Sequence, residues 1–100
     1  MSFSQDFRIS MQRALWGEIT PQVRAIALGW EGDVGRARFV FDATPGEHEY
    51  ETIYNVESEV VSDFPVGTQF EFVSEAYNEQ SLGFREGERW WAFVRWQESK

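Results

Sequence analysis

The sequence contains no cysteine and a single histidine, His48, among its 100 residues. Without cysteine the chain can form no disulfide, no thiolate nucleophile and no cysteine-ligated metal site. One histidine does not build a transition-metal site, and no spacing of serine and aspartate marks a catalytic triad. The loop Glu31-Gly32-Asp33-Val34-Gly35 is too short for a calcium loop. We therefore expect no cofactor, no metal and no enzymatic activity.

Long apolar runs and clustered basic residues are also missing. No stretch approaches the roughly 18 apolar residues that a membrane helix needs, and no basic region with an apolar run opens the chain. We expect a cytoplasmic protein without a membrane partner. The only lysine is Lys100, and phosphate binding requires clustered lysine and arginine, so we expect no nucleic acid partner.

Apolar and aromatic residues are plentiful, at 42% and 17% of the chain. One hundred residues form one domain, and a chain of this length buries enough surface to fold without a metal or disulfide. We expect a single domain over residues 1–100, with some aromatic rings left on the surface.

Negative charge is concentrated between Asp42 and Glu88, which contains twelve carboxylates and one basic residue, Arg85. The local net charge is −11, whereas residues 1–41 sum to +1 and residues 89–100 to +2. A field of one sign attracts partners of the opposite sign and repels nucleic acid. This asymmetry favours a basic protein as the partner.

Hydrophobic periodicity predicts two helices and four strands. The stretch Thr44-Pro45-Gly46-Glu47 predicts a helix start, with Thr44 as the cap and Glu47 completing a capping box. In the first strand Ile26, Leu28 and Trp30 alternate with small residues, which let another segment approach closely. The predicted helices are residues 4–16 and 44–63, and the predicted strands are residues 23–30, 36–42, 69–77 and 89–97.

The order α-β-β-α-β-β predicts an α+β fold, with two helices packed on one face of a four-stranded, mainly antiparallel sheet. The two strands on each side of the second helix are expected to form hairpins. If the last two strands pair, Trp91 and Phe93 share the helix-free face with Val73 and Tyr77. That aromatic strip can be ordinary cross-strand or dimer packing, or an interface with aromatic anchors.

Carboxylates occupy the second helix without a lysine or arginine to pair them. Its apolar stripe is expected to contain Tyr50, Ile53, Val56, Val60, Val61 and Phe64, and the opposite face to carry Glu47, Glu51, Glu59 and Asp63. The face is either simply solvated or bound by a cationic partner. Like charges four residues apart cost a few tenths of a kcal/mol each, which such a partner relieves.

Glu57 falls within the predicted apolar stripe of this helix. It can lie at the margin of the stripe or pair with a strand arginine such as Arg24. The functional alternative is a buried general base with a raised pKa. The sequence offers no second catalytic group, which favours the marginal position or the ion pair over the general base.

Two stretches carry a family resemblance: ALWGEITPQVRAI at residues 14–26 and VESEVVSDFP at residues 56–65. They resemble small acidic bacterial α+β proteins that serve as immunity proteins of contact-dependent inhibition and related polymorphic toxin systems. The similarity covers roughly residues 7–65. It implies a protein that binds and blocks a cognate toxin domain inside the producing cell, and it does not specify the interface.

These observations favour a non-enzymatic immunity protein that neutralises a basic toxin, such as a nuclease, through an acidic surface. The alternative is a homodimeric structural or regulatory domain that associates through its aromatic sheet face. The residues expected to bind the partner are Glu47, Glu51, Glu59, Asp63, Glu79, Glu86, Glu88, Trp91 and Phe93.

Overall fold

The computed structural model describes the backbone of residues 3–95 and the side chains from residue 5 onward. The predicted order of two helices and four strands is confirmed. Trp96 and Gln97, predicted to end the last strand, lie outside the described residues. The elements are α1 (Phe3–Ala14), β1 (Val23–Glu31), β2 (Val34–Phe41), α2 (Glu47–Val61), β3 (Gln69–Ala76) and β4 (Glu88–Val94).

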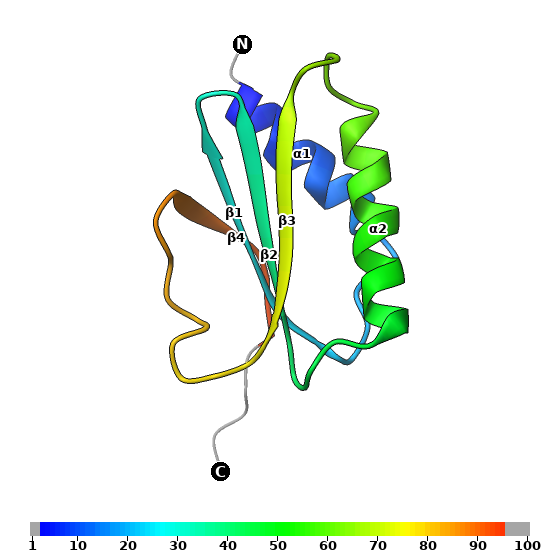
Figure 1. The fold of residues 1–100 in the computed structure, drawn as a ribbon, viewed down its shortest axis with the longest axis vertical. Helices are drawn as coiled ribbons and strands as arrows, with labels where there is room; N and C mark the ends of the chain where they lie inside the picture. Colours follow the sequence, from blue (N-terminus) through cyan, green and yellow to red (C-terminus); the bar gives the residue numbers. More distant parts are fainter. Residues whose placement is uncertain (1–2, 96–100) are drawn as a thin grey trace.

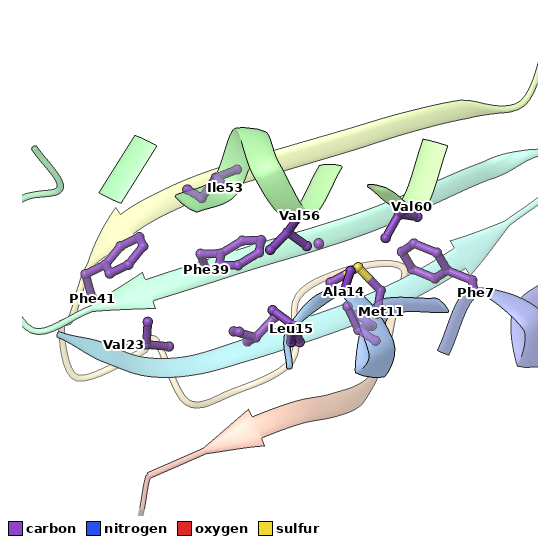
Figure 2. Close-up of a cluster of buried hydrophobic side chains, with 13 residues drawn as sticks. Phe7, Met11, Ala14, Leu15, Val23, Phe39, Phe41, Ile53, Val56 and Val60 are labelled. Carbon is purple, nitrogen blue, oxygen red and sulfur yellow. The ribbon is translucent and has the colours of Figure 1, made fainter. Parts of the chain in front are cut away.

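Both helices lie on one face of the sheet, as predicted (Figure 1). The core fills the space between the helices and this face (Figure 2). Phe7 and Met11 of α1, Val56 of α2 and Phe39 of β2 are all fully buried there. Because Phe7, Met11 and Ala14 are spaced three and four residues apart, they lie along one side of α1 and can all enter the core.

The four strands lie in the order β3-β2-β1-β4. β1 pairs antiparallel with β2 and with β4, whereas β2 and β3 are parallel. The sheet is therefore mixed, and the prediction of a mainly antiparallel sheet is wrong. The reason is that α2 carries the chain back along the sheet, so that β3 starts at the same end as β2.

The predicted hairpin between the last two strands is also wrong, since β3 and β4 form opposite edges of the sheet. Residues 77–87 connect these edges by crossing the face opposite the helices (Figure 1). A connection of this length is longer than most hairpin loops and is able to span the sheet. We call residues 77–87 the crossing segment.

The crossing segment approaches β1 very closely. Ala25 and Ala27, which point away from the helices, are fully buried. A Cβ atom on Gly29 would lie 2.0 Å from the carbonyl oxygen of Gly87. The predicted close approach to the small-residue side of this strand is thus confirmed.

The start of α2 differs from the predicted capping box. The helix begins at Glu47, after Gly46 in an extended conformation. The backbone amide of Gly46 donates to the Glu49 carboxylate at 2.8 Å. Glu49 therefore takes the role predicted for Glu47, and Glu47 is left at the exposed first turn.

The buried side of α2 is narrower than predicted. Thr52, Ile53, Val56 and Val60 are buried, whereas Tyr50 and Val61 are exposed by 55% and 45%. The predicted stripe is wrong at these two positions because α2 contacts its neighbours along one side only. Phe64, beyond the helix end, does pack as predicted, with its ring centroid 5.6 Å from that of Trp30.

Gly29→Ala is expected to destabilise the protein by about 1–3 kcal/mol, since the new methyl group would overlap a backbone carbonyl. Urea unfolding at pH 7 measures the change. Gly83→Ala is the matched control, because its Cβ would meet no atom closer than 3.7 Å. Equal effects of the two substitutions would contradict the close approach.

Candidate functional site

The twelve carboxylates between Asp42 and Glu88 form two groups in space. Five of them lie within ion-pair distance of an arginine of the same chain. The other seven have no arginine at that distance among residues 3–95. The paired group is Asp42, Asp63, Glu71, Glu75 and Glu88, and the unpaired group is Glu47, Glu49, Glu51, Glu57, Glu59, Glu79 and Glu86.

Arg38 of β2 is the centre of the paired group. It is only 2% exposed and lies under the crossing segment. Its Nε and Nη2 donate to the two carboxylate oxygens of Glu88, each at 2.8 Å, and its Nη1 donates to Glu75 at 3.2 Å. It also donates to the carbonyl oxygens of Ser81 and Gly83, both at 2.9 Å. These bonds attach the crossing segment to the sheet.

The two carboxylates of this network are held in their charged form. Burial alone would raise the pKa of Glu88, but hydrogen bonds from Arg38 and from the backbone amide of Arg85 outweigh it and leave this pKa below its ordinary value. Burial also opposes ionisation of Glu75, and hydrogen bonds from Arg85 and Ser81 lower the pKa of this group as well. The hydrogen bond to Glu88 in turn raises the pKa of Arg38.

Two residues expected to bind a partner are engaged inside the molecule. Glu88 is only 8% exposed at its side chain and is bound to Arg38. Asp63 accepts a hydrogen bond from the Ser10 hydroxyl at 2.6 Å and pairs with Arg13 at 3.5 Å. Both carboxylates connect elements of the fold, and neither presents a free charge.

Trp91 and Phe93 do not share a face as predicted. The pairing of β1 with β4 shifts by one residue at Ala92, so Ala27 lies opposite Trp91 and Ile26 opposite Phe93. Such a bulge turns the residues that flank it to opposite sides of the sheet. Trp91 stacks on Phe84 of the crossing segment with ring centroids 4.9 Å apart, and Phe93 packs against the core.

The predicted aromatic strip on the helix-free face is therefore absent from the described residues. Val73 lies on β3, at the opposite edge of the sheet from Trp91. Tyr77 lies under the guanidinium of Arg24, whose Cζ is 3.9 Å from the ring centroid. The crossing segment occupies the space between these residues, so this face offers no continuous aromatic surface.

The unpaired carboxylates gather mainly on α2. Glu47, Glu51 and Glu59 are exposed, and α2 contains no lysine or arginine. Glu79 and Glu86 are exposed on the crossing segment. The sequence thus predicted a helix with free negative charge, and the structure provides five exposed carboxylates from two segments.

Glu57 is half-buried at the margin of the buried side of α2. Arg24, its predicted partner, pairs instead with Asp42 at 3.4 Å. Asp42 also pairs with Arg95, and the hydrogen bond from Arg95 holds the pKa of Asp42 below its ordinary value. Within residues 3–95, no group of three carboxylate or histidine side chains could hold a metal ion.

Sequence reasoning missed the exposed aromatic residues of α2. Tyr54 is 67% exposed, and Tyr50, four residues earlier, lies beside it on the outer side of the helix. Tyr50 lies three residues before Ile53 and fits the spacing of the buried residues, so only the structure shows that it is exposed. For Tyr54, which falls outside the spacing of Ile53, Val56 and Val60, the signal was available. It was missed because aromatic residues in an amphipathic helix are usually assigned to the core.

A groove of about 870 Å³ lies between α1 and β4. Ile9 and Trp16 line one side, Trp90 and Ala92 the other. The guanidinium of Arg8 lies 5.0 Å from the ring centroid of Trp90, and the Gln12 side chain donates to the carbonyl of Ala92 at 3.1 Å. The groove is an apolar surface with a basic rim that Arg8 and Arg13 supply.

Residues 4–97 match the family model for the MafI2 immunity protein. The match covers nearly the whole chain, so the chain belongs to the MafI2 immunity protein family, as the resemblance to immunity proteins of polymorphic toxin systems had indicated. No curated protein matches the chain. Within residues 3–95 neither helix has the length and hydrophobicity required to cross a membrane.

The free energy of unfolding is expected to fall as the pH is lowered below about 4.5, the ordinary pKa of glutamate. Glu75 and Glu88 have lowered pKa values in the folded state, so protons bind more tightly to the unfolded chain. Their stabilisation is fully present above 4.5 and is lost as the pH falls through the folded-state values. Urea unfolding from pH 7 to pH 3 tests this.

Glu88→Gln should flatten this pH dependence, since it removes one of the carboxylates whose pKa is lowered by folding. Glu79→Gln, at an exposed carboxylate, should leave the curve unchanged. If the free energy of unfolding of Glu88→Gln fell with pH as steeply as that of the wild type, the contribution assigned to the lowered pKa of Glu88 would be contradicted.

Arg38→Met is expected to destabilise the protein by about 3–5 kcal/mol, because it leaves Glu88 buried without its cation. Arg36→Met is the matched control. Arg36 points to the same face of β2, but its partners Glu31 and Glu71 are 63% and 61% exposed, and exposed ion pairs contribute about 0–1 kcal/mol. Urea unfolding at pH 7 compares the two variants, and equal losses would contradict a central role for Arg38.

Proposed function

We propose that this protein binds and neutralises a cognate toxin domain with a basic surface, and that this toxin is a nuclease. Membership of the MafI2 immunity protein family over residues 4–97 is the observation that carries the proposal. The protein acts by binding and occlusion, without catalysis. It works in the cytoplasm, where it meets the toxin before the toxin meets its substrate.

The acidic outer face of α2 is the proposed contact surface. Glu47, Glu51 and Glu59 are exposed on a helix without basic residues. Glu79 and Glu86 are also exposed, but they lie on the crossing segment, on the face opposite the helices (Figure 1), and so form a separate candidate contact. Asp63, Glu88 and Phe93 are left out of the proposed surface, since they are held by Ser10, by Arg38 and by the core. Trp91 is left out because it stacks on Phe84.

A nuclease suits this surface because it holds phosphate with lysine and arginine side chains. The carboxylates of α2 would pair with those side chains and exclude the nucleic acid. Opposite charges on the two proteins also speed their encounter, which is useful for an inhibitor that must act before damage occurs.

Co-expression with the C-terminal domain encoded by the upstream reading frame, where we expect the cognate toxin, tests the proposal. We expect the chain to restore growth and to form a complex with that domain. The association rate constant should fall by about tenfold or more between 50 and 500 mM salt, because screening removes electrostatic steering. Stopped-flow measurements give this rate. The absence of a complex would contradict the function, and an association rate independent of salt would contradict the acidic surface.

A further inference from the structure

The outer side of α2 carries an apolar strip that the fold does not use. Tyr50, Tyr54 and Val61 are exposed by 55%, 67% and 45%. Their spacings of four and seven residues place them along one line of the helix. For the two tyrosines, residues 3–95 provide neither a hydroxyl partner nor a stacked ring. We call Tyr50, Tyr54 and Val61 the tyrosine strip.

The position of α2 leaves this strip open. The helix forms one flank of the molecule, and no other element lies on its outer side (Figure 1). Apolar residues exposed singly are common on protein surfaces, but two neighbouring tyrosines with a further apolar residue on the same line of a helix indicate an interaction site. Tyrosine is also among the residues that contribute most to protein interfaces.

Carboxylates without an internal partner flank the strip. Glu47 precedes Tyr50 by three residues, Glu51 precedes Tyr54 by three, and Glu57 follows Tyr54 by three, so each carboxylate lies next to a tyrosine on the helix surface. An arginine or lysine that approaches here can pair with a carboxylate and at the same time stack on the electron-rich face of a tyrosine ring. The strip is thus complementary to a partner with basic side chains.

The other exposed apolar surface does not fit such a partner. The groove between α1 and β4 also carries exposed apolar side chains, and Trp16 is 87% exposed. Its lining includes Arg8 and Arg13 and no carboxylate, so it repels a basic protein. A second copy of this chain fits the tyrosine strip poorly, because each copy carries a net charge of −8.

We infer that the tyrosine strip is the surface to which the basic toxin domain docks, with Tyr50 and Tyr54 as the anchors and the neighbouring carboxylates as the partners of its cations. The inference rests on the proposed function. It assigns the strongest contacts to two tyrosines, whereas the acidic residues mainly determine the rate of encounter and the orientation.

The test uses the full chain and the C-terminal domain encoded by the upstream reading frame. Tyr50→Ala and Tyr54→Ala should each raise the Kd at least about tenfold, as expected for interface anchors. Tyr54→Phe keeps the ring face and should stay within about threefold of wild type, while Tyr54→Leu should weaken binding more than Tyr54→Phe does. Trp16→Ala and Ile9→Ala, in the groove, are the matched controls and should bind as wild type.

Hydroxyl-radical footprinting of the wild-type complex provides a measurement without substitutions. Oxidation of Tyr50 and Tyr54 should fall when the toxin domain is bound, while oxidation of Trp16 stays unchanged. Each variant is checked by circular dichroism, and both tyrosines are exposed enough that their truncation should leave the fold intact.

Each contrary outcome has a separate meaning. If the wild-type chain does not bind the toxin domain, the proposed function itself fails. If the wild type binds and the tyrosine variants bind equally well, the inference is overturned and the function stands. Loss of binding in the Trp16 and Ile9 variants alone would place the contact in the groove. A dimer of the chain alone that Tyr54→Ala dissociates would make a second copy the occupant.

Discussion

The burial of Arg38 determines how the crossing segment covers the face of the sheet away from the helices. A guanidinium removed from water is costly unless hydrogen bonds and opposite charges replace its hydration. Arg38 obtains them from Glu88, from Glu75 and from two carbonyl groups of the crossing segment. Because these groups come from strands at opposite edges of the sheet and from the segment that joins them, the crossing segment must lie over β1 and β2. The small side chains of β1 make room for it.

The position of the crossing segment decides which surfaces remain exposed to a partner. The crossing segment covers the helix-free face. Its attachment to Arg38 engages Glu75 and Glu88, two of the twelve carboxylates between Asp42 and Glu88. The outer side of α2 and the groove beside α1 stay open, and they differ in charge: α2 carries only carboxylates, whereas arginines rim the groove. An immunity protein that binds a basic toxin would use the first of these surfaces. The internal ion pairs thus decide which carboxylates stay free, and the exposed unpaired ones among residues 3–95 lie mainly on α2.

Much of the local structure could be predicted from the sequence, and the errors have identifiable causes. The order of elements and the side of β1 that faces the core follow from hydrophobic periodicity, which depends only on neighbours along the chain. The pairing of strands depends on contacts between segments far apart along the chain, and periodicity does not report these. The sequence therefore predicted a hairpin between β3 and β4, whereas residues 77–87 cross the sheet. The bulge at Ala92 has no signature in the alternation of β4, and it separated Trp91 from Phe93. Of the nine residues expected to bind a partner, Glu47, Glu51, Glu59, Glu79 and Glu86 are exposed and have no arginine partner within residues 3–95.

By itself the sequence determined the elements, the acidic character of the chain and the resemblance to immunity proteins, since composition and periodicity are properties of the chain alone. Only the tertiary structure decided which carboxylates are free. Glu59 of α2 and Asp63, two residues beyond the end of α2, look equivalent in the sequence, yet one is solvated and the other is bound to Ser10 of α1. The difference arises because a charge is neutralised by what lies near it in space, and spatial neighbours come from segments far apart along the chain.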